Sequence, residues 1–342
     1  MLPSTTIPCK DKYKVKNWKA YNQSLVERGR LTIWLEDSVL RAWRDIDTSQ
    51  KVVGETLYDN CVIQCCLLLG QVYQQPLRQT TGFVGSLLTL LGHADYAIPD
   101  YTTLCRRQGC LPVEVSKALT GTKKIDLALD STGLKVYGDG EWKVRKHGAS
   151  KRRTWRKLHI GIDEQTQEIV CVELTTNGKD DAAVAGKMLQ GKTEKLKSFR
   201  GDGAYDDFAF REILGRGVRQ IIPPPKDAVL QHGPKKKPVP DYLQQRNQAV
   251  AFIQDYGRKT WKSQVGYHRR SLNEVAMFRY KTTFTAQMRA RKIEQQKTEV
   301  TLKCKILNIY RQPGMPVAYK VVWLPLAIGH IRKYSTVATK SM

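Results

Sequence analysis

The hydrophobic pattern of the chain changes at Lys123, and this change limits the folds open to it. Ile125, Leu127 and Leu129 alternate with smaller or polar residues, which is the period-two pattern of a β-strand. Further strands are predicted at residues 158–162, 168–174, 196–200 and 220–222, and helices at residues 181–189 and 206–216. Successive strands followed by alternating helices and strands predict an α/β or α+β core.

Residues 1–120 are predicted to be helical, with few strand signals. Apolar residues recur at helical spacing in residues 17–43 and 55–92. Asp100 is placed to cap a short helix that carries Arg106 and Arg107. This helix could be a helix-turn-helix reader of DNA, and it could equally be an ordinary solvated helix.

The second half of the chain contains a proline-rich break. Residues 223–240 hold six of the 14 prolines, which predicts a loop or an insertion. Regular helix is predicted to resume near Asp241, and one long helix is predicted at about 267–297.

The charge of the chain indicates its partner. Lys and Arg number 57 against 32 Asp and Glu, a net charge of +25, while 41% of residues are hydrophobic, enough for a core. This excess is larger than solubility requires, and it favours a polyanion, nucleic acid first.

Nothing in the sequence indicates a membrane protein. The apolar run from Val62 to Tyr73 is interrupted by polar residues and is too short to span a membrane. The N-terminus lacks the apolar stretch of a signal peptide. We therefore expect the protein to stay inside the cell. The eight cysteines are then expected to be thiols, and their spacings match no ordinary zinc pattern.

The most basic stretch extends from Lys143 to Lys157, with eight Lys and Arg residues and no acidic residue. We expect this run to contact backbone phosphates, with the tryptophan stacking on a base. A merely solvated hairpin is the alternative. The candidate DNA-binding residues in the run are Lys143, Arg145, Lys146, His147, Lys151, Arg152, Arg153, Trp155, Arg156 and Lys157.

Three carboxylates stand out by their context. Asp130 ends an apolar strand, Asp202 follows the strand at residues 196–200 between two glycines, and Glu274 lies in the late helix. Carboxylates brought together by a fold are the oxygen ligands that two Mg²⁺ ions need to act on a phosphodiester. Taken singly, acids at strand ends are usually solvated turn residues.

The surroundings of Glu274 support a functional site. At about 100° per residue, Tyr267, Arg270, Glu274 and Lys281 fall within an arc of about 60° on a helix. A basic pair beside a metal-binding carboxylate would hold phosphates on either side of the cut. An ordinary i, i+4 charge pair is the alternative. It would explain the pairing of Arg270 with Glu274, but not the alignment of Tyr267 and Lys281 on the same helix face.

These segments together resemble a known family. The sequences DSTGLKVYGDGEWKVRKHGASKRRTWRKLHIGID, GDGAYD and GYHRRSLNEVAMFRYK closely resemble transposases of the insertion sequence 5 family, a bacterial DDE group in the insertion sequence 4 superfamily. NWKAYNQSLVERGRLTIWLED, PDYTTLCRRQ and IIPPPKDAVL resemble the same group. The similarity covers about residues 13–317.

The resemblance implies an RNase H-like α/β catalytic core. Asp130, Asp202 and Glu274 would be the catalytic and metal-binding acids, and the family's Y-x2-R-x3-E-x6-K signature falls on Tyr267, Arg270, Glu274 and Lys281. In relatives, Mg²⁺ (two ions, which Mn²⁺ can replace) drives hydrolysis at the transposon ends, and the freed 3′-hydroxyl attacks target DNA. The family pattern makes none of the nearby acids a metal ligand: Asp126, Asp163, Asp180, Asp181 and Asp206.

The resemblance also suggests a division of the chain. Residues 1–120 would bind the terminal repeats, residues 121–315 would form the catalytic domain with an insertion at about 223–260, and residues 316–342 are an atypical tail, expected to be disordered or loosely packed. The partner would be double-stranded DNA, bound by a homodimer. A metal-dependent nuclease without strand transfer and an inactive DNA-binding derivative are the alternative functions.

Overall fold

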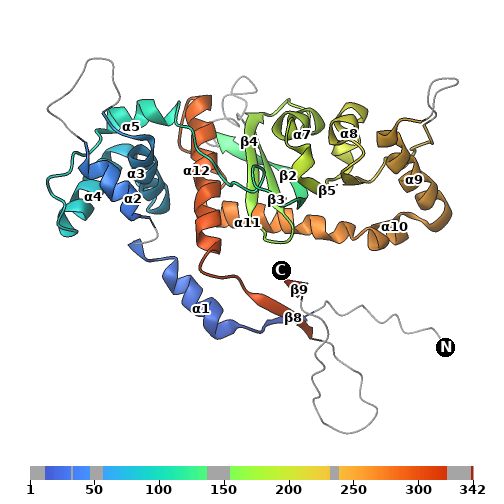
Figure 1. The fold of residues 1–342 in the computed structure, drawn as a ribbon, viewed down its shortest axis with the longest axis horizontal. Helices are drawn as coiled ribbons and strands as arrows, with labels where there is room; N and C mark the ends of the chain where they lie inside the picture. The colour runs from blue at the N-terminus through green and yellow to red at the C-terminus, as the bar shows by residue number, and fades with distance from the viewer. Residues whose placement is uncertain are drawn as a thin grey trace, which may run out of the picture. The chain divides into compact units, whose positions relative to one another are not determined.

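The structure is a computed structural model that describes residues 12–31, 34–46, 57–136, 155–231, 239–321 and 340–341. The chain forms two compact units. One unit combines residues 1–31 with residues 310–342, and the other comprises residues 32–309 (Figure 1). In the described part of the chain, no helix has both the length and the apolar character needed to cross a bilayer.

A mixed β-sheet forms the centre of the larger unit. Its main path has the order β4-β3-β2-β5-β6, and β7 pairs with β2 off this path. The strands are β2 (Ile125–Val136), β3 (Trp155–Asp163), β4 (Ile169–Thr176), β5 (Leu196–Arg200), β6 (Arg219–Ile221) and β7 (Gln287–Met288). β2, β3 and β4 are antiparallel, whereas β5 and β6 run parallel to β2. The strands expected from the sequence are confirmed, and so is the mixed α/β core.

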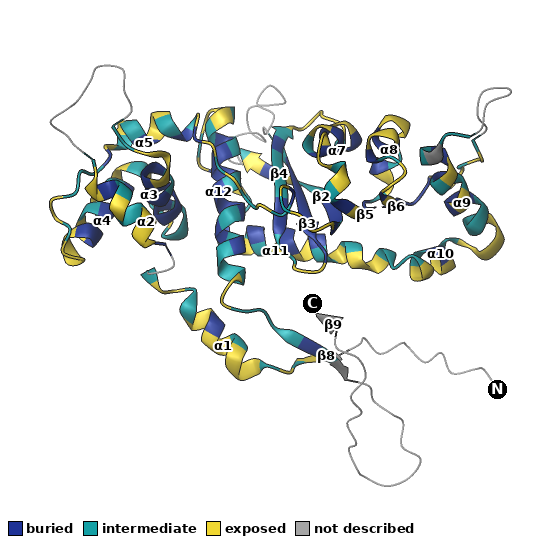
Figure 2. Cartoon of the chain, viewed as in Figure 1, coloured by how far each residue is buried: buried dark blue, intermediate teal, exposed yellow. Residues whose placement is uncertain are grey.

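One face of the sheet is covered by α7 (Asp181–Leu189) and α8 (Phe208–Leu214). Leu127 and Leu129 of β2 share a buried cluster with Ala185 of α7, Phe199 of β5 and Phe210 of α8. Leu127 and Leu129 are alternate residues of β2 and both are buried, so one side of the strand packs against the helices. Figure 2 colours the buried residues of the sheet dark blue. The even positions, including Asp130, are left for the opposite face.

The opposite face is covered by α11 (Ser271–Phe284), which Figure 1 shows running across β2 and β3. The buried side chain of Asn273 donates a hydrogen bond of 2.9 Å to the carbonyl oxygen of Ile160 in β3. α12 (Ile293–Arg311) also contacts the sheet, because the Asn308 amide bonds both backbone groups of Ile169.

The prediction of one long helix at residues 267–297 is wrong. A 3₁₀ helix, η4 (Tyr267–Arg270), precedes α11. α11 ends at Phe284, and the next residue is Thr285, a β-branched residue with φ +67°. Gln287 and Met288 then pair with β2. The Glu299 carboxylate of α12 accepts hydrogen bonds from the amides of Arg289 and Ala290. These contacts with β2 and α12 override the local helical pattern, which is why periodicity did not reveal the break.

Helices occupy the N-terminal part of the larger unit: α2 (Asp37–Arg44), α3 (Asn60–Val72), α4 (Leu77–Leu90) and α5 (Tyr101–Gln108). α3 is apolar on most sides and is buried along most of its length. It packs closely on α4, because a Cβ at Gly70 would lie 2.6 Å from Oγ1 of Thr80. The predicted cap is confirmed, since the Asp100 carboxylate accepts a 2.8 Å hydrogen bond from the amide of Thr102.

The segment between β6 and η4 is largely helical after its proline-rich start. It contains α9 (Asp241–Tyr256) and α10 (Arg258–Gln264), so the expected helix start at Asp241 is confirmed. A small core joins Ile221 of β6, Ala249 of α9 and Trp261 of α10. The buried carboxylate of Asp206 also ties the segment to α8 through Arg211 and Arg246.

The smaller unit contains strands that the sequence analysis did not predict. β1 (Lys12–Val15) precedes α1 (Trp18–Glu27) and pairs antiparallel with β8 (Val317–Val321), which also pairs with β9 (Lys340–Ser341). The N-terminal region is therefore not helical throughout. The tail begins with a strand rather than with disordered chain, because its β-branched and aromatic residues meet a complementary strand from the other end of the sequence.

His159 makes the stability of the fold depend on pH. The buried ring of His159 lies on β3, its Nε2 3.0 Å from the Thr175 hydroxyl and its Nδ1 3.3 Å from the Asp181 carboxylate. Burial lowers the pKa of His159 from 6.5 to about 4, although Asp181 acts in the opposite direction. The folded state therefore keeps the ring neutral where the unfolded chain protonates it, and this contribution to stability is lost as the pH falls from 6.5 towards 4.

We predict that lowering the pH from neutral to about 4 reduces the free energy of unfolding by up to about 3 kcal/mol more in the wild type than in His159→Gln. Urea denaturation of both proteins at several pH values measures this difference. Parallel pH profiles of the two proteins would contradict the assignment.

Candidate active site

The parallel pairing of β2 and β5 brings two of the predicted acids side by side. In this register Ala128 is opposite Arg200, and two residues further along each segment stand Asp130 and Asp202. Asp130 lies within β2, on the face covered by α11, and Asp202 lies just past the end of β5.

The turn that carries Asp202 is tightly constrained. A Cβ at the preceding Gly201 would lie 2.6 Å from the Tyr205 ring and 3.0 Å from the Phe199 ring, so the turn requires glycine there. The Asp202 carboxylate accepts a 2.9 Å hydrogen bond from the amide of Ala204, at the start of η3 (Gly203–Tyr205). This bond fixes one oxygen of Asp202.

Arg270 joins the other two elements of the site. Its Nη1 donates to Oδ2 of Asp130 at 2.7 Å, and its Nη2 pairs with Oε1 of Glu274, one turn further along α11. The guanidinium therefore lies between the acid of β2 and the acid of α11, and both carboxylates accept charge-assisted hydrogen bonds from it.

The electrostatics of Asp130 reflect this crowding. Burial raises the pKa of Asp130, and the like charges of Asp202 and Glu274 raise it further. The amide of Ser131 and the charge of Arg270 oppose the rise. Three acids thus act on one another across three segments of the chain, with Arg270 as the nearby compensating cation.

Tyr267 and Lys281 flank this cluster. Burial raises the pKa of the Tyr267 phenol, although the charge of Arg270 opposes the rise. The ammonium of Lys262 lies 4.9 Å from the centre of the Tyr267 ring. Lys281 donates a 2.6 Å hydrogen bond to the hydroxyl of Thr132, two residues beyond Asp130 on β2. All four signature residues therefore border one region of the sheet.

Comparison with known families identifies the domain that contains these residues. Two models of the transposase DDE domain match the chain, one over residues 26–139 and one over residues 121–309. The second match covers more than half of the chain and includes all three acids. The chain belongs to the transposase DDE domain family. No solved structure matches it.

The described part of the basic run lies at the start of β3 in the DDE domain. The ammonium of Lys135 lies 5.8 Å from the Trp155 ring, Arg156 donates to Gln296 at 3.0 Å, and Lys157 pairs with Asp181 at 3.0 Å. The remaining predicted residues of this run fall outside the described residues: Lys143, Arg145, Lys146, His147, Lys151, Arg152 and Arg153.

The two arginines of α5 are in different environments. Arg107 is held by the carbonyl of Tyr58 at 2.8 Å and by the side chain of Asn60 at 2.6 Å, so it links α5 to the start of α3. Arg106 is exposed, with Thr103 as a hydrogen-bond partner.

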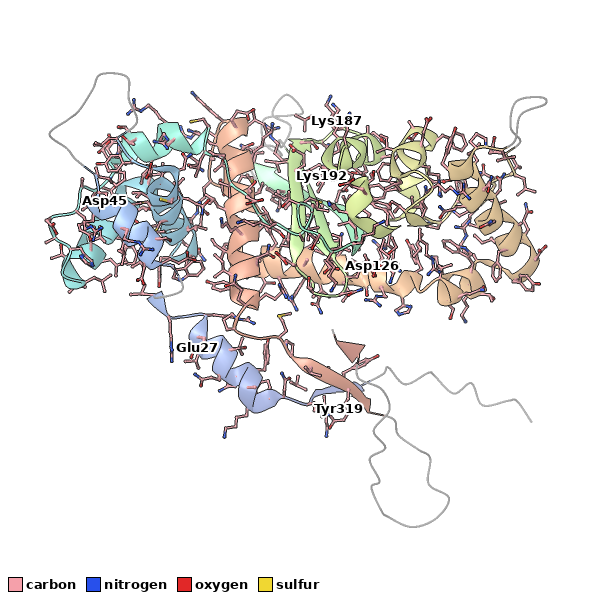
Figure 3. All side chains as sticks on the ribbon, viewed as in Figure 1. Glu27, Asp45, Asp126, Lys187, Lys192 and Tyr319 are labelled. Carbon is pink, nitrogen blue, oxygen red and sulfur yellow. The ribbon has the colours of Figure 1, made fainter. Side chains whose placement is uncertain are left out.

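The neighbouring acids make structural contacts. Asp126, labelled in Figure 3, accepts hydrogen bonds from Ser198 at 2.6 Å and Gln165 at 2.9 Å. Asp163 accepts from the amides and the hydroxyl of the turn that follows β3. Asp126 therefore shares a strand face with Asp130, but its partners are Ser198 and Gln165, whereas Asp130 pairs with Arg270.

One carboxylate that connects the segments of the site has no signal in the sequence. The buried carboxylate of Glu164, at the end of β3, pairs with Arg200 at the end of β5. Its other oxygen lies 3.1 Å from Nε of Arg269, the residue before Arg270. One carboxylate thus ties the segment leading to Asp202 to the segment leading to Glu274. No sequence spacing indicates it, since its partners are 36 and 105 residues away.

We predict that Glu164→Gln lowers the free energy of unfolding by about 3–5 kcal/mol, because it leaves the buried charge of Arg200 without its counter-ion. Chemical denaturation measures the loss. Glu212→Gln, an exposed acid on α8, is the matched control and should change stability by less than about 0.5 kcal/mol. Equal stability of the two variants would contradict a structural role for Glu164.

Proposed function

We propose that the chain is the transposase of a bacterial element of the insertion sequence 5 type. It binds the element's terminal inverted repeats, cleaves DNA at its ends and joins the freed 3′-hydroxyls to target DNA. The observation that carries this proposal is the convergence of Asp130, Asp202 and Glu274, from three distant segments, around Arg270 within the matched DDE domain.

Divalent metal chemistry fits the donor set. All three acids offer carboxylate oxygens, the ligands that Mg²⁺ prefers. Burial raises the pKa of Asp130 and the charges of Asp202 and Glu274 raise it further, and a cation bound at these acids would oppose that rise. Among the described residues no three His, Cys, Asp or Glu side chains are close enough to hold one ion, and Arg270 pairs with two of the acids. A metal ion and Arg270 would compete for the same oxygens.

Asp130, Asp202 and Glu274 would hold two Mg²⁺ ions, or Mn²⁺ in their place. The chemistry that such ions supply is activation of the attacking water or hydroxyl and stabilisation of the leaving oxygen. The side chains of this chain do the rest. Lys281 and Arg270 supply positive charge on either side of the acids for the phosphates that flank the reacting one, and Tyr267 provides a ring and a phenol beside Arg270.

The remaining regions complete the proposal. Residues 1–120 recognise the ends and support assembly, residues 121–315 carry the reaction with an insertion at about 223–260, and residues 316–342 extend beyond them. Two subunits act together, one on each end of the element.

We predict that Asp130→Asn, Asp202→Asn and Glu274→Gln each reduce strand transfer at least about a hundredfold, because metal-ion stabilisation is worth several kcal/mol. The assay uses a labelled duplex that carries the element's own ends, with Mg²⁺ or with EDTA. Asp126→Asn is the control on the same strand face and should stay within about threefold of wild type.

The outcomes of this assay separate the candidate functions. Metal-dependent joined products that disappear in the three variants support the transposase. Cleavage without joining would indicate a nuclease, and specific binding with neither reaction would indicate a DNA-binding derivative of the element.

We also predict that Arg270→Gln binds Mg²⁺ about tenfold more tightly than wild type, a gain of about 1.4 kcal/mol, because the metal no longer competes with the guanidinium. Calorimetric titration without DNA measures this affinity. Arg270→Lys, which keeps the charge, is the matched control. Weaker Mg²⁺ binding by Arg270→Gln than by wild type would contradict the competition.

A further inference from the structure

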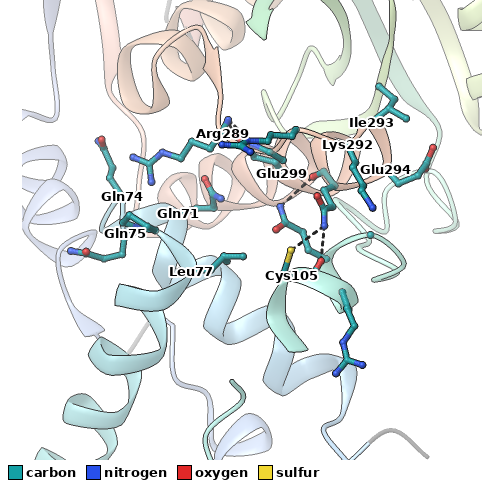
Figure 4. A pocket seen from close by; sticks show the side chains of 17 residues that line it. Gln71, Gln74, Gln75, Leu77, Cys105, Arg289, Lys292, Ile293, Glu294 and Glu299 are labelled. Atoms are coloured by element: carbon teal, nitrogen blue, oxygen red, sulfur yellow. Dashed lines mark hydrogen bonds between the residues drawn. The ribbon is translucent and has the colours of Figure 1, made fainter. Parts of the chain in front are cut away.

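The larger unit also contains a groove lined by exposed cations, and none of the three acids is part of its lining. We name it the α5–α12 groove. Its lining comes from the end of α3, the turn after it and the start of α4 (71 and 74–77), from the end of α5 (105, 106, 108 and 109), and from residues 289–295 with Glu299 (Figure 4). Its cavity volume is about 1240 Å³. We propose that this groove binds the sugar–phosphate backbone of the duplex on which the active site acts, an inference that rests on the proposed function.

The charges that line the groove match a polyanion. Arg106, Arg289, Arg291 and Lys292 line it and are exposed, against one exposed acid, Glu294. The other lining acid, Glu299, is buried and paired with Lys303. Within the described parts of the chain, Arg289, Arg291 and Lys292 form no ion pair. These three cations therefore remain available to phosphates.

The cationic segment is held in place before any ligand arrives. The Glu299 carboxylate accepts the amide hydrogens of Arg289 at 3.1 Å and Ala290 at 2.8 Å. The buried amide of Gln296 donates to the carbonyls of Ala290 at 2.9 Å and Arg291 at 3.2 Å. The backbone is thus fixed from the side of α12, and ordering costs little on binding.

The opposite wall is tied to the same helix. The Gln295 side chain donates to the carbonyl of Cys105 at 2.7 Å, and Gln108 donates to the carbonyl of Gln295 at 3.2 Å. Leu77 and Ile293 add apolar surface to the lining. Apolar contacts for deoxyribose and exposed cations for phosphates are the features that a DNA backbone needs.

The groove lies near the C-terminal end of β2, further along the strand than Asp130. From Asp130 the strand continues to Val136, which pairs with Met288, and Arg289 follows directly. Six residues of strand span about 20 Å, or about six base pairs of duplex. Arg156 lies along this path, because it donates to Gln296 behind the cationic segment. A duplex that lies along β2 with its reacting phosphate at the acids would therefore meet the groove about six base pairs away.

The first test removes two charges from the groove. Arg289→Ala/Arg291→Ala should weaken binding of a duplex carrying the element's end about tenfold, and should reduce the slope of log K against log salt by about 1.8, or 0.9 for each phosphate contact. The matched control is Lys192→Ala/Lys226→Ala, two exposed lysines outside the groove, the first labelled in Figure 3. The control should bind within about twofold of wild type.

The second test uses a cysteine of the groove as a reporter. Cys105 lines the groove and is exposed, whereas the exposed Cys61 of α3 is not part of the lining. In the wild-type protein, bound duplex should slow alkylation of Cys105 several-fold and leave Cys61 unchanged, as measured by mass spectrometry.

The outcomes separate this proposal from the proposed function. Unchanged duplex affinity in the groove variant, or equal alkylation of Cys105 with and without DNA, overturns the groove assignment while wild-type binding and strand transfer stand. Binding of an acidic protein by such a groove would then be the alternative use. A wild-type protein that binds no duplex overturns both proposals.

Discussion

The parallel pairing of β2 with β5 is the constraint on which the site depends. It sets Asp130 beside Asp202, and the antiparallel pairing of β2 with β3 provides the surface on which α11 lies. A slip of one residue in either register would turn Asp130 into the apolar layer under α7 and α8. Leu127 and Leu129 fill that layer and stabilise the sheet. Because they fix the register, they also determine to which face the side chain of Asp130 points.

Buried charges connect what the sheet alone does not. Glu164 links the ends of β3 and β5 to the segment before α11, and Asp206 links α8 to α9 in the segment that precedes the signature residues. Such pairs add little net stability compared with apolar packing, but breaking one leaves a buried charge without a partner. They therefore specify where the acid-bearing segments lie more than they strengthen the fold.

The sequence predicts the parts of this arrangement that depend on local patterns. Alternation around Leu127 predicts β2, helical spacing predicts α7, and the prolines after Ile222 predict a break that ends at Asp241. The three acids stand out singly by their sequence context, but the resemblance is what joins them into one site, since separations of 72 residues contain no local signal. The interruption at Thr285, the strand at Val317 and the role of Glu164 depend on partners far away in the chain. Tertiary contacts determine these three features, and a short stretch of sequence does not contain both partners of such a contact.

The balance of charge around the site explains why so basic a chain carries three acids at its centre. A phosphodiester that approaches Asp130, Asp202 and Glu274 meets like charge, and a local dielectric lower than that of water makes the repulsion stronger. Arg270 offsets part of it, and Lys281, which bonds Thr132, and Arg156, which is paired with Leu134, lie further along the face of β2 that carries Asp130. In the proposed function, these cations would attract the polymer along its path, and a metal ion held by the three acids would reverse the sign of the charge where they lie.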